Sequence, residues 1–364
     1  MSATCTSTRS SWRASRAGCR RTRTATPRTG TRPPATVESA TWADILAQAI
    51  FHTLVASLLV EALVRSWGVR EPRQRMALRL TALGYPLVLF PALVALFPGR
   101  AGEGFREDLA IFDARSWEAV RLLGVGLYWW WLAAFAAVGA ALFFMDLLPV
   151  LRGRGRRAPE GQLPGAESAA VLDAELPRAA AALGIPEPPV VFLDRDLPVL
   201  FCTGVRRPAL VVSRGTLARL DRDELRAALA HELAHVAGRD PLKSWILMGL
   251  RALMFWNPAF QVVSRALARD AEWLADERGA AACGDRVALA SGLLKLHRAT
   301  GGAAVPRTLP FAAALAEPLA RVRSHDIEVR CRRLLDGAPA RLPYGGARVA
   351  LAGAGLTALL FFVV

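Results

Sequence analysis

The chain has 364 residues, of which 53% are hydrophobic, and its mean hydropathy is +0.28. This composition is too apolar for an ordinary soluble enzyme and indicates a membrane protein. The formal net charge is +15, but the arginines lie in the N-terminal tail and beside apolar segments, which favours a membrane-flanking role over nucleic-acid binding. Five scattered cysteines without a C-x-x-C spacing support neither a disulfide framework nor a cysteine metal site.

Residues 1–40 are rich in Ser, Thr and Arg and show no apolar period, which predicts a disordered basic tail. A basic tail conflicts with the membrane orientation derived below, in which the N-terminus lies outside. Either the stretch is not part of the native product, because the start was placed too far upstream, or the later loops determine the orientation. We favour the first explanation.

Four apolar stretches are candidates for membrane helices, the last of them slightly short: Ile45–Val64, Leu80–Phe97, Val120–Phe144 and Val349–Val364. They predict a three-helix transmembrane region over residues 41–151 and a C-terminal helix over 347–364. Arginine clusters follow the first and third stretches, so both connections are expected on the cytoplasmic side. The acidic connection between the second and third stretches is expected outside.

A short helix-forming stretch, Ala166–Leu183, lies in a predicted linker over residues 152–189, and Pro177 is expected to interrupt it. Three β-branched or apolar runs follow and predict a small sheet: Val190–Leu193, Val199–Cys202 and Ala209–Ser213. The fold class is therefore a mainly α membrane protein of about four transmembrane helices with a cytoplasmic α+β domain over residues 190–346.

A helix is predicted directly after the sheet, beginning at a capping box of Asp221 and Glu224 and ending at Gly238. It carries the pattern H-E-x-x-H, with His231 and His235 one turn apart on a single face. Two imidazole nitrogens on one face can bind one metal ion, and Glu232 beside them can accept a proton. We prefer this interpretation to an amphipathic helix that binds nothing.

The third ligand of a catalytic zinc has to come from elsewhere in the chain, because such sites hold three protein ligands and an open position. Glu272 and Asp276 are four residues apart on a second predicted helix. Glu272 is the candidate ligand, and Asp276 is the candidate acceptor for the outer N–H of a ligating histidine. Without the upstream motif, this charged helix would be interpreted as a solvated surface.

These motifs resemble the membrane-embedded gluzincin metallopeptidases, in particular the BlaR/MecR-type antirepressor peptidases, and they are also similar to HtpX-like and CAAX-prenyl endoproteases. The resemblance rests on H-E-L-A-H, Arg239-Asp240, the run from Phe255 to Pro258, and the pair Glu272 and Asp276. It implies that His231, His235 and Glu272 bind Zn²⁺ and that Glu232 is the general base. It also implies that peptide substrates lie along an edge strand of the small sheet.

Between the two motif helices, Pro241–Phe260 is apolar but contains Lys243 and Arg251. It is too charged for a clear span and predicts an interfacial helix whose basic side chains reach lipid headgroups.

The sequence therefore predicts a multi-pass cell-membrane zinc endopeptidase that cleaves a regulatory or membrane-associated protein at the cytoplasmic face. Its partners are a protein or peptide substrate and the lipid bilayer. Two alternatives remain: an HtpX-like quality-control protease, and a non-catalytic zinc-bearing signalling scaffold, against which the intact Glu232 argues. No S-x-x-K motif is present, so β-lactam sensing is not expected. The sequence does not indicate the substrate or the oligomeric state.

Overall fold

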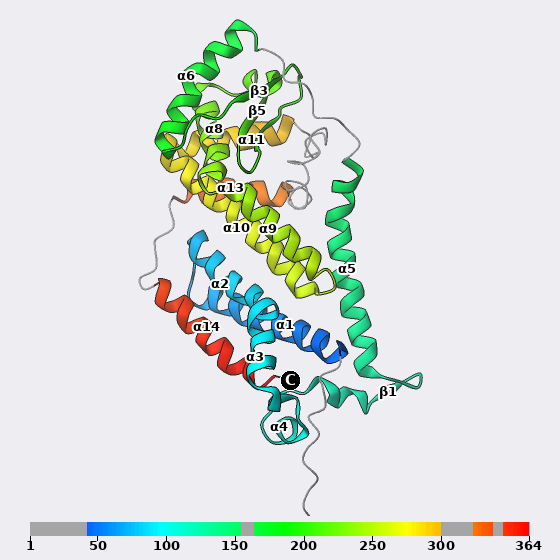
Figure 1. Cartoon of the computed structure of the whole chain (residues 1–364). Helices are drawn as coiled ribbons and strands as arrows, with labels where there is room; N and C mark the ends of the chain where they lie inside the picture. Colours follow the sequence, from blue (N-terminus) through cyan, green and yellow to red (C-terminus); the bar gives the residue numbers. More distant parts are fainter. Residues whose placement is uncertain (1–41, 154–163, 300–322, 338–344, 364) are drawn as a thin grey trace, which may run out of the picture. The chain divides into compact units, whose positions relative to one another are not determined.

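The structure is a computed structural model that describes residues 42–153, 164–299, 323–337 and 345–363. The expected basic tail over residues 1–40 lies outside the described residues. The described part is mainly helical, with one three-stranded sheet and a two-stranded hairpin (Figure 1). A mainly α membrane protein with a small α+β region is therefore confirmed.

Three stretches of helix are long and apolar enough to cross a membrane: Trp42–Ser66, Pro72–Leu96 and Leu127–Met145. The first is helix α1, Trp42–Ser66, and the third is most of α5, Leu127–Gly153. The second consists of α2, Pro72–Gly84, a π-helical turn η1, Tyr85–Leu89, and α3, Phe90–Leu96. The fourth expected span is α14, Gly345–Phe361, which is apolar but shorter.

All four helices begin at other residues than the apolar pattern predicts, and the second and third differ most. The second begins at Pro72 rather than Leu80, because Arg75 and Arg79 in its first turns have buried partners and do not end the helix. The third begins at Leu127 rather than Val120. The residues between form a hairpin of β1, Arg121–Leu122, and β2, Val125–Gly126, and its turn residues Leu123 and Gly124 have positive φ.

The connection between the second and third of these helices also contains three short helices: η2, Pro98–Ala101, α4, Glu103–Asp108, and η3, Ala114–Glu118. The remaining helices are α6, Ala166–Leu183; α7, Arg214–Leu217; α8, Arg222–Ala237; α9, Asp240–Leu253; α10, Pro258–Cys283; α11, Arg286–Ala299; and α13, Arg323–Leu335.

The small sheet has the strand order β3-β5-β4, and it lies beside α6 and α8 (Figure 1). Its strands are β3, Val190–Leu193, β4, Leu200–Thr203, and β5, Ala209–Ser213, within one residue of the predicted runs. β3 pairs parallel with β5, whereas β4 pairs antiparallel with it and forms an edge. Because β4 is an edge strand next to α8, one row of its backbone groups faces the helix that carries the H-E-x-x-H motif.

Helix α6 lies in the stretch expected to be a linker, and Pro177 does not interrupt it. Proline has no N–H, so the backbone carbonyl of Asp173, one turn before Pro177, lacks its helical donor. Both residues are exposed, so water can donate to this carbonyl instead. The opposite face of α6 buries Leu176 and Ala179 against Leu229 and Leu233 of α8. This helix therefore contributes to the hydrophobic core behind the motif helix.

A buried ionic cluster joins α1 and α2 to α10. Arg79 is 4% exposed and pairs with the fully buried Asp270 and, at 2.7 Å, with Glu61 of α1. The Nε of Arg75 donates to the same Asp270 at 3.0 Å. Arg75 also stacks over the ring of Trp273, as does Arg333 of α13 at 4.2 Å from the ring centre. The helices of the membrane region are thereby joined to α10 by charged groups that mostly have no access to solvent.

We expect Asp270→Asn to lower the free energy of unfolding by about 3 to 5 kcal/mol, because it leaves the buried guanidinium of Arg79 without its principal counter-charge. Unfolding of the purified protein in detergent micelles, followed by denaturant titration, measures this change. Asp194→Asn is the matched control, because Asp194 pairs with Arg214 at 2.8 Å but both side chains are more than half exposed. The control is expected to change stability by less than about 1 kcal/mol. Equal stability losses in the two variants would contradict a structural role for the buried cluster.

Candidate metal centre

Helix α8 begins at the predicted capping box, which the structure confirms. Asp221 accepts hydrogen bonds from the backbone N–H groups of Asp223 and Glu224, and Glu224 accepts one from Asp221. Glu224 also accepts hydrogen bonds from Ser291 and Lys295 of α11, each at 2.6 Å. The start of the helix is fixed by its own cap and by a neighbouring helix, so the motif two turns further on has a defined orientation.

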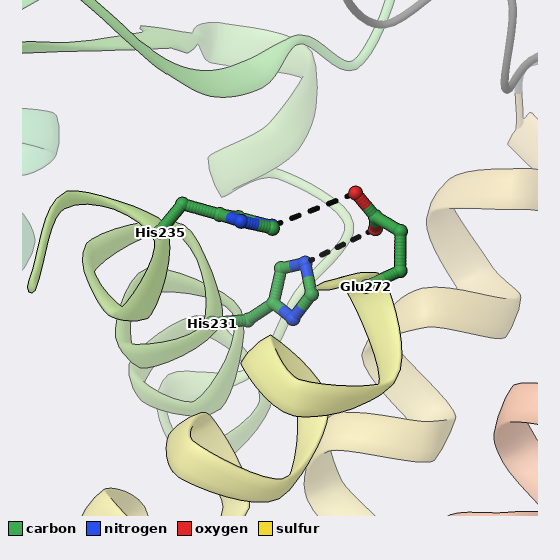
Figure 2. Close-up of side chains that lie close together, drawn as sticks. All are labelled: His231, His235 and Glu272. Atoms are coloured by element: carbon green, nitrogen blue, oxygen red, sulfur yellow. Dashed lines mark ion pairs between the residues drawn. The ribbon is translucent and has the colours of Figure 1, made fainter. Parts of the chain in front are cut away.

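The structure brings together the three residues that the sequence proposes as metal ligands. Figure 2 shows His231 and His235 of α8 with their rings directed towards Glu272 of α10. Nε2 of His231 lies 3.8 Å from one carboxylate oxygen of Glu272, and Nε2 of His235 lies 3.6 Å from the other. One ligand atom from each residue lies within 4.8 Å of the others.

This approach of α10 to α8 depends on Gly279. A Cβ atom at Gly279 would lie 2.8 Å from the Cα atom of His231, a separation that real Cβ atoms essentially never show. Any side chain larger than hydrogen would therefore push the two helices apart at the point where the candidate metal ligands meet.

The inner ring nitrogens face two further carboxylates. Nδ1 of His231 lies 3.0 Å from Asp276, at ion-pair distance but without good hydrogen-bond alignment. Nδ1 of His235 makes a 3.0 Å hydrogen bond with Asp240, the first residue of α9. Each imidazole therefore has Nδ1 on a carboxylate and Nε2 towards Glu272, the arrangement that fixes the orientation of metal-ligating histidines.

Arg330 of α13 closes one side of the cluster. Its guanidinium donates two hydrogen bonds to Asp276, at 2.6 and 2.7 Å, and lies 3.2 Å from Glu272. It also lies 3.3 Å from Nε2 of His231. One cation thus holds the orienting carboxylate and at the same time borders two of the three candidate ligands.

The donor set fits a zinc ion. Tetrahedral zinc with ligand distances of about 2.0 to 2.1 Å places its ligand atoms about 3.3 Å apart, close to the 3.6 and 3.8 Å observed between the histidines and Glu272. Small side-chain rotations cover the difference. Four carboxylates surround the two imidazoles, those of Glu232, Asp240, Glu272 and Asp276. A divalent cation would balance this excess of negative charge.

The charges in the cluster shift the pKa values of its members. Burial alone would raise the pKa of Asp276, but the charge and hydrogen bonds of Arg330 and the contact with His231 hold it well below its ordinary value. Burial would lower the pKa of His235, yet the carboxylates of Glu272 and Asp240 raise it to about 9. The carboxylates around His235 therefore favour a positive charge at this ring, which is the same preference that a bound cation would satisfy.

Glu232 lies beside the candidate ligands, next to the edge strand. Burial raises the pKa of its carboxyl above the ordinary value, and the neighbouring histidines lower it in part. The backbone N–H of Cys202 on β4 donates a hydrogen bond to it. Successive residues of a strand point their backbone groups to alternate sides, so the outer edge of β4 that includes Cys202 faces the motif helix.

Sequence reasoning gave no role in the site to Asp240, Arg330 or Gly279. Asp240 lies in the Arg239-Asp240 pair that carries the family resemblance, but only the three-dimensional contacts connect Asp240 and Arg330 to particular ring nitrogens and carboxylates. The signal that was available for Asp240 is its distance along the chain, because it follows His235 by little more than one helical turn.

A motif helix with two histidines, a second helix with Glu272, and apolar helices long enough to span a bilayer together define a membrane-associated metallopeptidase of the gluzincin type. Comparison with known families agrees. The chain matches the BlaR1 peptidase M56 family over residues 120–316, more than half of its length, and belongs to this family.

Among curated proteins, the chain is similar to Protease HtpX homologs of three bacteria. It is 34% identical to that of Ralstonia pickettii, 33% to that of Ralstonia nicotianae and 32% to that of Burkholderia multivorans, each over 172 residues. Each match covers 38% of this chain and 58% of the relative. The chain thus spans little more than half of the length of these relatives. No solved structure matches significantly.

We expect Asp276→Asn and Asp240→Asn each to raise the dissociation constant for zinc about 10- to 100-fold, because each variant loses the carboxylate that orients one imidazole. Competition with a chromophoric chelator measures this constant in the purified protein. Asp223→Asn serves as the control, since Asp223 lies on the same helix α8 with its side chain 68% exposed. Unchanged zinc affinity in both orienting variants would show that these carboxylates do not support the metal site.

Proposed function

We propose that the protein is a zinc-dependent endopeptidase of the membrane that hydrolyses peptide bonds of a regulatory or membrane-associated protein at the cytoplasmic face. The observation that carries the proposal is the meeting of His231, His235 and Glu272 within 4.8 Å, with Glu232 on the same helix. Membership of a peptidase family supports hydrolysis as the reaction. In this proposal residues 190–346 form the peptidase domain, together with the packing helix α6.

In the proposed mechanism His231, His235 and Glu272 would hold Zn²⁺, which would supply Lewis-acid chemistry by acidifying a water molecule and polarising the scissile carbonyl. Glu232 takes a proton from the attacking water at its carboxylate and returns it to the leaving amine nitrogen. Its raised pKa suits both steps, because a group whose pKa lies closer to the working pH is effective as base and then as acid. The Cys202 N–H holds the carboxylate in place.

The outer edge of β4 is the proposed site for the substrate backbone. An extended peptide laid along this edge would use the outward backbone groups of the strand, so that recognition does not require one particular sequence. The edge faces Glu232 through Cys202, so a peptide held there has its carbonyl groups next to the proposed general base.

The basic ends of the membrane helices support the proposed cytoplasmic location. The connection between α1 and α2 contains Arg65 and Arg70, and Arg75 in the first turn of α2 contacts Asp270, close to Glu272 in the chain. The candidate metal centre is therefore on the same side as this arginine-rich connection, which the positive-inside rule assigns to the cytoplasm.

A second candidate function is the degradation of damaged membrane proteins. The similarity to Protease HtpX homologs favours this alternative, which shares the same chemistry and differs in the substrate. A regulatory peptidase is expected to cleave one or a few proteins, whereas a quality-control protease is expected to cleave many.

Both candidates are tested by comparing new protein N-termini, by mass spectrometry, between cells that contain the wild-type protein and cells that contain Glu232→Gln at equal levels. Glu232→Gln keeps the size of the side chain but removes the proton acceptor, so we expect cleavage to fall at least 100-fold. The zinc content of the purified variant should remain that of the wild type. Undiminished cleavage in the variant would exclude Glu232 as the general base.

His235→Ala is the matched comparison, because it should abolish both cleavage and zinc binding. Zinc bound to wild-type protein without any Glu232-dependent cleavage, across several stress conditions, would favour the non-catalytic scaffold. A few cleaved proteins would favour the regulatory peptidase, and a broad set of membrane proteins would favour the quality-control protease.

A further inference from the structure

Helices α9 and α10 run side by side as a hairpin that leads away from the candidate metal centre and returns to it (Figure 1). α9 begins at Asp240, which contacts His235, and α10 carries Glu272. The turn between the helices, Met254 to Asn257, is the far end of the hairpin. All of these residues are described by the structure.

The turn packs against three candidate membrane spans, in each case near the middle of the span. The side-chain amide of Asn257 donates to the backbone oxygen of Ala49, at 3.2 Å, and to the hydroxyl of Thr53, at 3.0 Å, in α1. The backbone of Trp256 lies against Gly139 of α5, where a Cβ atom would come within 2.4 Å of it.

The depth of these contacts can be estimated from the helical rise of about 1.5 Å per residue. Ala49 and Thr53 lie about 10 to 17 Å along α1 from Trp42, and Gly139 lies about 18 Å along α5 from Leu127. Half of a bilayer's hydrocarbon thickness is about 15 Å, so both helices present the mid-bilayer level to the turn.

Contacts with α2 place the turn at the same depth and indicate the direction in which α10 runs. Phe260, near the turn, shares a buried cluster with Leu83, about 16 Å along α2 from Pro72. Asp270 pairs with Arg75, which is close to the Pro72 end. α10 therefore runs from the middle of the span towards its basic end.

The buried polar side chains around the turn have partners within the protein. The buried Arg251 donates to the side-chain oxygen of Gln261, at 2.9 Å, and the amide nitrogen of Gln261 donates to the backbone oxygens of Arg251 and Met254. No buried side-chain nitrogen or oxygen between Asp240 and Arg265 lacks a hydrogen-bond partner. Irregular backbone at membrane depth requires this kind of internal pairing, because hydrocarbon offers no partners.

The outward surface of the hairpin is apolar. Between Lys243 and Arg265 the exposed residues are Ile246, Gly249, Ala252, Leu253, Phe255 and Val262. Leu253 is 61% exposed and Val262 is 54% exposed. The polar residues Asp240 and Lys243 are at the opposite end, beside the metal centre. The hairpin therefore changes from apolar at its turn to polar at its other end, as the neighbouring spans do towards their basic ends.

We propose that α9 and the first half of α10 form a re-entrant hairpin inserted into the bilayer, with its turn near the mid-plane and its apolar surface in contact with lipid acyl chains. An interfacial helix, as expected from the sequence, would instead lie in the headgroup layer. The contacts with the middle of α1, α2 and α5 favour the inserted position.

The inserted hairpin fixes the depth of the catalytic site. Glu272 follows Pro258 by about 21 Å of helix, and the hydrocarbon extends about 15 Å from the mid-plane. Glu272 therefore lies at the inner edge of the hydrocarbon or in the headgroup layer, depending on helix tilt. The substrate class that this depth favours is a peptide segment immediately next to a membrane anchor.

Site-directed spin labels on the full chain in phospholipid vesicles test the insertion. Each label is attached to a single cysteine in a background with the native cysteines replaced, and its accessibility to oxygen is compared with that to a water-soluble nickel chelate. Leu253→Cys and Val262→Cys are the test sites. Leu58→Cys on α1, 64% exposed, is the lipid-facing control, and Val287→Cys on α11, also 64% exposed, is the water-facing control.

We expect the ratio of oxygen accessibility to nickel-chelate accessibility to be at least tenfold higher at positions 253 and 262 than at position 287. At both test positions this ratio should equal the ratio at position 58. Equal accessibility to the chelate at 253, 262 and 287 would overturn the proposal, and an intermediate value would assign the hairpin to the headgroup layer instead. Zinc content, measured on each labelled protein, verifies the fold. The test is independent of proteolysis, so its failure would leave the proposed peptidase function standing.

Discussion

The pairing of Asp270 with two arginines of α2 is the contact on which the arrangement of the other parts depends. Asp270 is fully buried and precedes Glu272 by two residues on the same helix, so any displacement of its carboxylate moves the turn that presents the candidate zinc ligand. The same ionic cluster reaches Glu61 of α1. Buried pairs tolerate little misalignment, because an unpaired charge in an apolar environment is strongly unfavourable. The apolar helices and the candidate metal centre are consequently held in one relative position by a few charged side chains.

A second constraint is the sharing of partners around the two histidines. Asp276 contacts His231 through Oδ1 and accepts hydrogen bonds from Arg330 at both carboxylate oxygens, while Glu272 faces both imidazoles and Arg330. Three helices, α8, α10 and α13, therefore meet at a single set of charges. Such a set is preorganised, since each side chain is fixed by at least one partner within the protein. The chemistry proposed for Glu232 benefits from this, because its neighbours need not rearrange when substrate arrives.

The local elements and the candidate ligands were accessible from the sequence for physical reasons. The capping box at Asp221 and the spacing of His231 and His235 are local patterns, and the strands near residues 190, 200 and 209 are short apolar runs between turns. Features that depend on distant partners were not accessible. In the sequence, the charge of Arg79 sets the start of the apolar stretch of the second span. In the structure, Asp270, which lies far along the chain, neutralises this charge. Asp240, Arg330 and the insertion of the α9–α10 turn among α1, α2 and α5 likewise follow from tertiary contacts.

The contact of Gly279 with the backbone of His231 also bears on how related chains are recognised. H-E-x-x-H patterns arise by chance in many helices, and a downstream glutamate is common. A glycine two helical turns beyond that glutamate, on the face turned towards the first histidine, is a separate requirement, because only hydrogen fits between the two backbones. Chains that keep both motifs but carry a larger residue at this position would have to separate the helices, and would no longer be able to close the three ligands around one ion.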